Sequence, residues 1–494
     1  MGRERMKVFP RWLYFLLTVL AVGAIYYFSV GLSGFGPLIW IAPIPIIILA
    51  FDLSPRTTMV IAFSAFLLGC FTLFSYLAQL MPIGMVIVSL VIPAIAFALA
   101  VLTTRYAVLH FNHWSTVFVF PAVWTSYEYL LSVVSPHGTA GSLAYTQIDI
   151  LPLLQIVSLT GLWGVTFILT LIPASIAVAW HLRRNKRQAV PALVIPLSLG
   201  LLILSFGWVR LAQPISGQSI RVGLAATDTT IRYFRTGKSE EALPVVQAYA
   251  RRINDLAAQG AKVIVLPEKF VGVTPAYAND VYQILMEAAR NNQVMVIAGL
   301  NRIGTGHSMN AAVVFSPEGQ VVAEYNKIHL VPGFESRYQA GTKPAEFSFF
   351  STTAGVAICK DMDFPGLLSQ YARDGVGIVF VPAWDFGQDG RWHARMAIMR
   401  GIEGGFAVVR SAQDGLLTVS DHLGRILAED KSSREADVLL VSDVQPGPGH
   451  TFYSLSGDWV AWLNLLFLML LSTKTLFKTG RTRKVLPANA AVKR

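Results

Sequence analysis

The sequence contains few charged residues and almost no cysteine. Only 14% of its 494 residues are Asp, Glu, Lys or Arg, whereas soluble domains carry about 25%, and this shortage argues against an ordinary water-soluble enzyme. Its two cysteines, Cys70 and Cys359, are too few for a scaffold held together by disulfides. No Cys/His cluster has the spacing of a zinc site, so we expect no metal. The 54% of hydrophobic residues instead indicates a membrane protein.

Long apolar runs fill the sequence as far as residue 212 and return near the C-terminus. A helix that crosses a membrane needs about 20 mostly apolar residues. The first run follows a basic start like that of a secretion signal, but its length and the early second run favour a retained helix. The sequence therefore predicts a polytopic membrane protein with about eight spanning helices, at 12–30, 37–51, 59–77, 83–102, 116–134, 154–180, 190–211 and 459–476.

A mixed segment separates the seventh apolar run from the eighth. We predict a membrane domain over 1–218, an extramembrane domain over 219–445, and a C-terminal helix with a basic tail over 446–494. In the middle domain, β-rich runs alternate with amphipathic segments, which predicts an α/β sandwich with a mixed sheet. Strands are expected at 220–225, 263–266, 294–299, 311–316, 355–358, 378–382, 406–411 and 416–420, and helices at 240–259, 278–292, 366–374 and 391–403.

The charge of the chain is unevenly distributed. Its net charge is +11, from 40 Lys and Arg against 29 Asp and Glu. Every Lys and Arg before residue 219 except Arg210 falls in one set of alternate loops, and such residues mark the cytoplasmic side. This pattern predicts cytoplasmic termini and an extracytoplasmic middle domain; a cytosolic domain with one helix miscounted is the alternative. The middle domain is nearly neutral, which argues against nucleic-acid binding.

Three polar side chains stand at or near the ends of β-rich runs in the middle domain, where α/β folds place catalytic groups. Glu268 follows an apolar run, and a partly desolvated carboxylate suits general-base work. Lys327 opens an apolar stretch and fits the stabilisation of an oxyanion. Cys359 ends a strand before a turn, as a nucleophile does. Taken singly, each is better explained as a solvated Glu, a surface Lys or a buried thiol.

Other candidates are less specific. Glu335 fits proton transfer, the positioning of Lys327 or a loop salt bridge, and the sequence leaves these open. His329 and Cys70 fit structural roles better than catalytic ones. Glu128 is the one clear carboxylate inside an apolar run, and a transporter usually has more such groups or an internal repeat.

Taken together, the three segments are far more specific than any one of them. Pro-Glu268, Tyr-Asn-Lys327-Ile-His-Leu-Val-Pro and Ile-Cys359 follow one another in this order. The middle domain thus resembles the nitrilase, or carbon–nitrogen hydrolase, superfamily with its Glu–Lys–Cys triad, which implies an αββα sandwich. Because membrane helices flank this domain, the whole chain resembles the bacterial apolipoprotein N-acyltransferase family. Weaker matches lie at Glu128 and in the segments 144–147, 399–403 and 409–411.

The resemblance implies a two-step acyl transfer in the bacterial cytoplasmic (inner) membrane. Glu268 takes the proton of Cys359, and the thiolate attacks a phospholipid ester while Lys327 holds the oxyanion. The resulting thioester passes its acyl chain to the α-amino group of a diacylglyceryl-cysteine apolipoprotein. Glu335 matches a further family glutamate. The resemblance implies no cofactor, and we expect a monomer.

The sequence departs from the family around this triad. The family commonly has Cys-Tyr-Glu, whereas here Lys360 and Asp361 follow Cys359, and we expect both to support the site. We also expect the aromatic and polar residues of three other family segments to bind substrate; they are Tyr233, Phe234, Trp384, Phe386, Tyr145 and Gln147.

These departures keep other functions open. The alternatives are a related membrane acyltransferase with another amine acceptor, and a membrane-tethered amidase or hydrolase that passes the thioester to water. A pseudoenzyme or a transporter fits least: the intact triad argues against a pseudoenzyme, and the single intramembrane carboxylate and the lack of a sequence repeat argue against a transporter.

Overall fold

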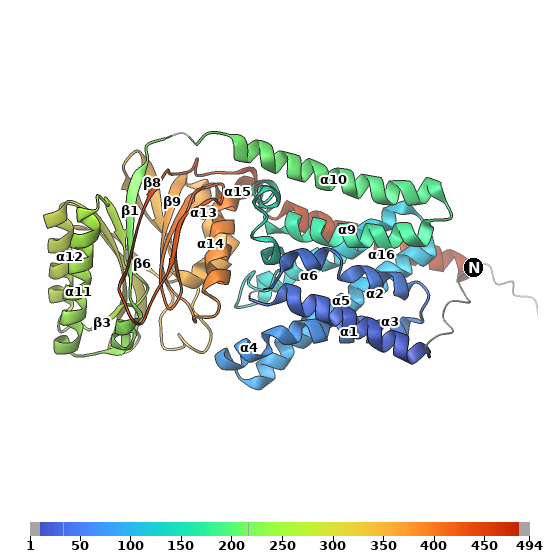
Figure 1. Ribbon diagram of the computed structural model, residues 1–494, viewed down its shortest axis with the longest axis horizontal. Helices are drawn as coiled ribbons and strands as arrows, with labels where there is room; N and C mark the ends of the chain where they lie inside the picture. Colours follow the sequence, from blue (N-terminus) through green and yellow to red (C-terminus); the bar gives the residue numbers. More distant parts are fainter. Residues whose placement is uncertain (1–9, 33, 216, 484–494) are drawn as a thin grey trace, which may run out of the picture.

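The computed structural model describes residues 10–32, 34–215 and 217–483. A block of helices and an α/β domain lie end to end (Figure 1). Several of the basic residues predicted to be cytoplasmic lie outside the described residues, namely those at positions 3, 5 and 7 and those after residue 483. The long helices of the helical block are α1, α3, α5, α6, α9 and α10; their bounds are Arg11–Val30, Pro55–Cys70, Ile83–Phe111, Val119–Val134, Leu162–Leu182 and Lys186–Ala212. The short helix α4, Phe74–Leu80, follows α3.

The described chain contains six helical segments that are long and apolar enough to cross a membrane, so the predicted count of about eight is not confirmed. The segment predicted at 37–51 is a 3-10 turn, Gly36–Trp40, followed by α2, Pro43–Ala50. Eight helical residues span only about 12 Å, against a hydrocarbon core of about 30 Å. Proline, which donates no backbone hydrogen bond, begins α2 and thereby keeps the two pieces separate.

The segment predicted at 154–180 is also divided. It forms α7 (Leu151–Leu154), α8 (Val157–Thr160) and then α9, with Gly161 at a φ of 62° between the last two. Only glycine adopts such a backbone readily, so the break is built into the sequence. The last helix, α16 (Trp459–Arg483), has a described apolar part of Trp459–Thr473, so its crossing stays a prediction.

The α/β domain contains two facing sheets. One has the strand order β13-β1-β2-β4-β5-β6, with β3 beside β4, and the other has the order β12-β11-β10-β9-β8-β7. Helices α11 (Ser239–Ala258) and α12 (Ala278–Asn292) cover the first sheet, and α13 (Pro365–Arg373) and α14 (Gly390–Gly404) cover the second (Figure 1). This arrangement is the expected αββα sandwich.

The predicted strands and helices of this domain are all present, with ends shifted by a few residues. The strands β1–β13 span Ile220–Ala226, Val263–Val265, Val271–Val273, Met295–Arg302, Met309–Phe315, Val321–Asn326, Ala345–Phe349, Thr352–Val356, Val376–Trp384, Ala407–Gln413, Leu416–Ser420, Ile426–Lys431 and Val438–Val444. The expected strands do not include β3, β6, β7, β12 or β13. β3 has only three residues, and β12 is an exposed edge strand without a buried apolar face.

Buried polar side chains join the two parts of the molecule. On α14, Arg400 donates to the Tyr145 hydroxyl (3.0 Å) and pairs with Glu403 (2.6 Å). The Glu403 carboxylate accepts the backbone N–H of Leu162 (2.7 Å), at the first residue of α9. Thr139 in turn bonds both Tyr145 and the backbone carbonyl of residue 363. The α/β domain is therefore fixed against the helical block by charge-assisted hydrogen bonds.

Glu128 lies in the helical block, in α6, and has a structural role. Its carboxylate accepts hydrogen bonds from Trp124, Ser142, Thr166 and the backbone N–H of Leu143, at 2.6 to 2.8 Å. A buried carboxylate with this many donors is satisfied where it stands. Glu128 therefore ties α6 to α9 and to the loop before it, and its bonding gives no support to a transporter.

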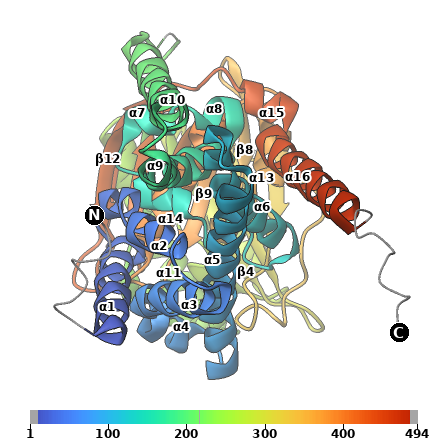
Figure 2. The same ribbon diagram turned by 90° about the vertical axis from the view of Figure 1, so that its right-hand side faces the viewer.

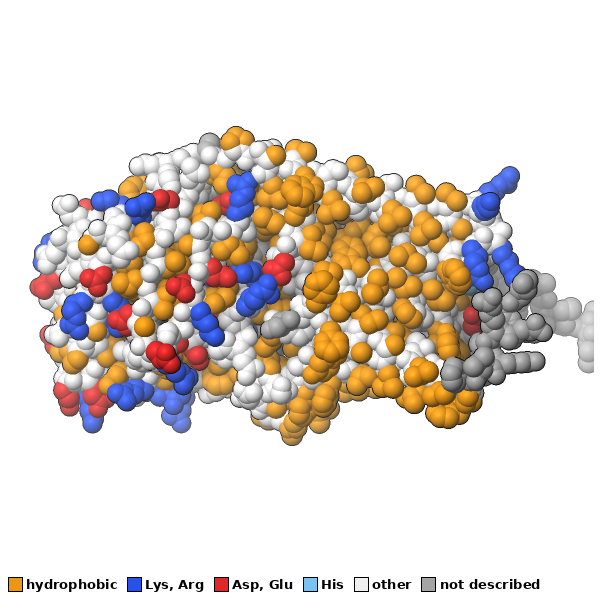
Figure 3. Space-filling model, viewed as in Figure 1, with side chains coloured by type: hydrophobic (Ala, Val, Ile, Leu, Met, Phe, Trp, Pro, Cys, Tyr) orange, Lys and Arg blue, Asp and Glu red, His pale blue; other side chains and the backbone are white. Residues whose placement is uncertain are grey.

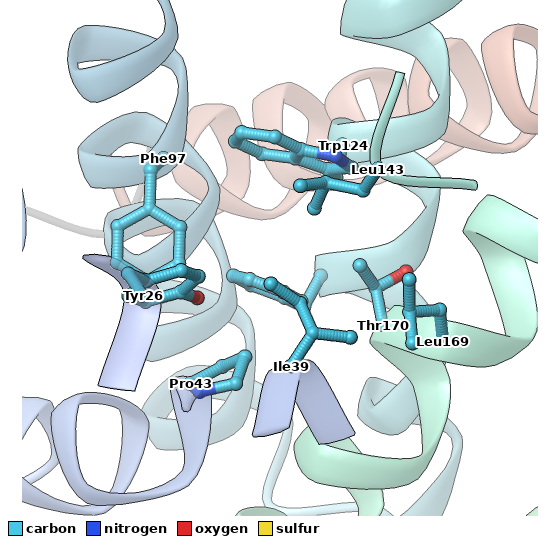
Figure 4. A pocket seen from close by; sticks show the side chains of 9 residues that line it. Tyr26, Ile39, Pro43, Phe97, Trp124, Leu143, Leu169 and Thr170 are labelled. Carbon is cyan, nitrogen blue, oxygen red and sulfur yellow. The ribbon is translucent and has the colours of Figure 1, made fainter. Parts of the chain in front are cut away.

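Surface chemistry follows the division into two parts. Hydrophobic side chains cover the helical block, whereas charged side chains gather on the α/β domain (Figure 3). Lys and Arg reappear at the end of the block farthest from that domain. α10 and α16 lie at the periphery of the bundle (Figure 2). Inside the bundle, Tyr26, Trp124 and Leu169 line a small cavity of about 10 Å³ (Figure 4), which leaves room for about one water molecule.

Candidate active site

Glu268 is held where the two sheets meet. It follows β2 and is 1% exposed. Its backbone N–H donates to the carbonyl of Ala383 (3.2 Å), and its own carbonyl accepts from the Gln413 side chain (2.8 Å). Both partners belong to the second sheet, so this carboxylate from the first sheet is fixed at the carboxyl ends of β9 and β10.

Lys327 directly follows β6 and reaches the same place. Its Nζ lies 2.9 Å from Glu268 Oε1 and 3.0 Å from Glu335 Oε2. Burial alone would lower the pKa of Lys327, but these two carboxylates outweigh burial and hold the pKa well above its usual value. Lys327 is therefore a fixed ammonium, as its proposed oxyanion role requires.

Cys359 lies at the start of a 3-10 turn, Cys359–Asp363, with a φ of 43°. A non-glycine residue adopts this left-handed conformation at a cost, and such strain is concentrated at functional sites. The residue as a whole is partly exposed, and its Sγ lies 3.4 Å from the carbonyl oxygen of Trp384. Burial and the Glu268 carboxylate raise the thiol pKa, and Lys327 opposes them. The thiol therefore needs a base that takes its proton.

Glu335 and Asn310 complete the surroundings of Glu268. Asn310 Nδ2 donates to Glu268 Oε1 (2.5 Å) and to Glu335 Oε1 (2.7 Å). Burial would raise the pKa of Glu335, but Lys327 and Lys269 hold it well below its usual value. Glu268 Oε1 thus receives several donors, whereas the buried Oε2 has no hydrogen-bond partner among the described residues. That free oxygen is available to accept a proton.

The site also contains a second buried ammonium, Lys269, which the sequence analysis missed. Its Nζ lies 2.7 Å from Glu335 Oε1 and 3.6 Å from Glu268 Oε1. The same atom is 5.5 Å from the centre of the Trp384 ring, within cation–π range. The charges of the two carboxylates, Glu268 and Glu335, and of the two ammonium groups, Lys269 and Lys327, therefore cancel in this site. The only signal for Lys269 in the sequence was that it directly follows Glu268. No sequence signal pointed to Asn310.

Asp361 and Lys360 point away from one another. Asp361 accepts hydrogen bonds from the Tyr325 hydroxyl (2.8 Å), from the backbone N–H of Ile358 (3.0 Å) and from His329. It therefore holds the turn that carries Cys359. Lys360 is buried and instead bonds Asp363 (3.1 Å) and His137 (3.4 Å), in the loop that follows α6.

The predicted substrate-binding residues divide into two groups. Phe234 packs edge-on against Trp384, at 4.8 Å between ring centres, so both lie at the active centre. Phe386 lies at the exposed rim, 5.1 Å from the Phe334 ring. Tyr233 instead packs on the outer side of the first sheet.

Two of these candidates lie in the helical block. Tyr145 is part of the Arg400 junction, and Gln147 is bonded to Trp40 (2.8 Å) and to the carbonyl of Gly36 (2.9 Å). The structure does not bring either of them to Cys359. In the described part of the chain, no group of three or more His, Cys, Asp or Glu side chains is arranged to hold a metal ion.

Comparisons with known proteins match both parts of the chain. A family model described as the apolipoprotein N-acyltransferase N-terminal domain matches residues 22–175, and one described as carbon-nitrogen hydrolase matches residues 224–446. An apolipoprotein N-acyltransferase of Geobacter metallireducens is 25% identical over 491 residues, which cover 91% of this chain and 92% of the relative. A deaminated glutathione amidase of Synechocystis sp. is 30% identical over 34% of this chain and 71% of its own.

A solved structure is also similar. The amidase of Nesterenkonia sp. has a TM-score of 0.40 and 20% identity, covering 47% of this chain and 92% of its own. The two matched models follow one another along the chain, and the Geobacter relative extends over nearly all of it. The chain belongs to the apolipoprotein N-acyltransferase family.

Proposed function

We propose that this protein transfers a fatty acyl chain from a membrane phospholipid, through a thioester on Cys359, to the α-amino group of the diacylglyceryl-cysteine of an apolipoprotein. The named relatives support the reaction. The observation that carries the mechanism is the free Oε2 of Glu268, a carboxylate whose other oxygen, Oε1, is held by Lys327 and Asn310.

In the first step, Glu268 Oε2 takes the proton from Cys359 Sγ, and the thiolate attacks the ester carbonyl carbon. Lys327 stabilises the oxyanion of the tetrahedral intermediate. The carbon–oxygen bond then breaks, the proton on Glu268 passes to the departing lysophospholipid oxygen, and the acyl group stays on sulfur. Glu268 is again a carboxylate, so the step conserves protons.

In the second step, the neutral amine attacks the thioester carbonyl carbon. Glu268 takes a proton from the amine nitrogen and returns it to Cys359 as the carbon–sulfur bond breaks. The amide product leaves, and the free thiol is restored. The same three side chains therefore serve both half-reactions, and all come from one chain, in keeping with a monomer.

We further propose that the α/β domain lies on the extracytoplasmic side, with both termini in the cytoplasm. α10 begins at Lys186 at the end of the block far from the α/β domain and ends at Ala212 beside it (Figure 1). The basic loop before α10 is therefore at the far end, where the positive-inside rule places cytoplasmic residues.

The thioester supplies a direct test of the reaction. Incubation of the purified protein with a phospholipid labelled in its acyl chain should attach the label to Cys359 as a hydroxylamine-sensitive adduct, read by peptide mass spectrometry. Adding a diacylglyceryl-cysteine peptide should move the label to that peptide's N-terminus. If the label appears only as free fatty acid, hydrolysis replaces transfer. If it appears on another residue, Cys359 is not the nucleophile.

A further inference from the structure

Arg210 is an exception to the charge pattern of the membrane part. It stands near the end of α10 beside the α/β domain, whereas the other basic residues before residue 219 fall in the loops predicted to be cytoplasmic. Arg210 is not explained by the acyl-transfer chemistry described above.

A crevice of about 310 Å³ opens beside this side chain, between the end of α10 and the loop that precedes α15 (Phe452–Ser456). This volume is in the range of small-molecule sites. Its lining combines polar and apolar side chains, among them Arg210, Phe206, Val209, Gln213, His450 and Phe452. Val209 is 64% exposed and Phe452 is 56% exposed, so the apolar side of the crevice continues onto the surface that α10 presents to lipid.

The guanidinium of Arg210 is held in place but not neutralised. Its Nη1 donates to the side-chain oxygen of Gln155 (3.0 Å), and Gln155 is itself fixed by the carbonyl of Leu423 (2.9 Å). No described carboxylate lies in ion-pair contact with Arg210. The nearby Asp421 affects Arg210 through its charge, but it pairs with Arg425 instead. The remaining N–H groups of Arg210 have no partner among the described residues, so they are free to bind an anion.

We infer that this crevice binds the phosphate-bearing headgroup of a membrane glycerophospholipid. An arginine is the side chain best suited to a phosphate, since its planar N–H groups match the phosphate oxygens. Phe206, Val209 and Phe452 would contact the start of the acyl chains. The site lies where α10 leaves the membrane-spanning block, at the depth of lipid headgroups.

This lipid is not the one whose ester is cleaved. The loop beside His450 lies against the start of β9, where Gly447 donates to the carbonyl of Gly377 (2.8 Å). Cys359 lies at the other end of the same strand, beside Trp384. The ends of a strand of nine residues are about 26 Å apart. The crevice is therefore a separate lipid site, and its existence does not depend on the proposed reaction.

Photo-crosslinking of the full chain tests this inference. The probe is an ether-linked phospholipid with a diazirine next to its glycerol, which has no acyl ester to transfer, in a maltoside detergent free of phosphate. Label is expected on peptides that contain 206–213 or 450–452. Arg210→Gln should reduce it about tenfold, since a charge-assisted bond is lost, and Arg210→Lys should retain part of it. The exposed Arg56, at the far end of the block, supplies the control Arg56→Gln, which should leave labelling unchanged.

Competitors separate the possible ligands. The unlabelled ether phospholipid should displace the probe, whereas the matching dialkylglycerol and inorganic phosphate should not. Equal labelling of Arg210→Gln, or equal competition by dialkylglycerol, would overturn the inference. Displacement by inorganic phosphate alone would show a site for a free anion instead. If Arg210→Gln does not fold, Val209→Trp fills the crevice from an exposed position and should also reduce labelling; unchanged labelling would then refute the site.

Discussion

Cys359→Ala should abolish acyl transfer while the protein remains folded and inserted in the membrane. The substitution removes the only atom to which the acyl chain is bound in the proposed mechanism, so the expected loss is about 10⁴-fold or more. Packing is little changed, because alanine differs from cysteine by one sulfur atom and Cys359 is not a fully buried residue. The measurement is the rate of transfer from a labelled phospholipid to a diacylglyceryl-cysteine peptide.

Two comparisons make this result specific. Cys70→Ala removes the other cysteine, which lies buried in α3, and it should leave transfer close to wild type. A strain depleted of its own N-acyltransferase should grow with the wild-type gene and with Cys70→Ala, but not with Cys359→Ala. Mass spectrometry of a lipoprotein N-terminus then identifies the product. Measurable transfer by Cys359→Ala would remove the nucleophile from the proposal.

Lys269→Met should lower the rate of thioester formation roughly 100-fold, because it leaves two buried carboxylates with one ammonium. Lys269 Nζ is 2.7 Å from Glu335 and 3.6 Å from Glu268. Without it the cluster carries a net negative charge, which opposes formation of the Cys359 thiolate. The rate of Cys359 alkylation by iodoacetamide, measured across pH, should fall in Lys269→Met and be largely restored in Lys269→Arg. Lys262→Met, an exposed lysine at the other end of β2, is the matched control.

The charge argument also predicts how two substitutions combine. Glu335→Gln alone leaves an excess ammonium, and Lys269→Met alone leaves an excess carboxylate. The double variant is neutral again, so its alkylation rate should exceed that of Lys269→Met by about tenfold. If the two losses instead multiply, Lys269 acts by packing against the Trp384 ring and not through the charge of Glu335.

Glu268 and Cys359 are predictable from the sequence because each follows an apolar run that forms a buried strand, whereas Lys327 follows a largely exposed strand and is identified by its match to the family motif. The surroundings of the triad are not predictable, because they depend on pairing between strands. Asn310 lies on β5 and reaches Glu268 only because β5 stands between β4 and β6. The apolar content of 37–51 predicts a spanning helix, and the backbone effect of its prolines overrides that signal.

The residues chosen by resemblance alone lie in different places in the structure, for the same reason. Asp361 and Trp384 lie at the nucleophile because they are close to it in sequence or on the adjacent strand. Tyr145 and Gln147 belong to another part of the chain, and their hydroxyl and amide groups are bonded within the helical block and to α14. The side chain of Tyr145 joins the two parts of the molecule, whereas that of Gln147 is bonded within the helical block. A motif match alone does not say whether a side chain points toward the active site or is bonded elsewhere in the molecule.

The junction around Arg400 has a consequence for kinetics. It fixes the α/β domain to the helical block, and the chain is connected to that block at both ends of the domain. Under the proposed function, both substrates are also confined to the membrane by their acyl chains. Enzyme, donor and acceptor then meet by diffusion in two dimensions. The rate is therefore governed by the mole fractions of donor and acceptor in the bilayer, and diluting the vesicles in buffer should leave it unchanged.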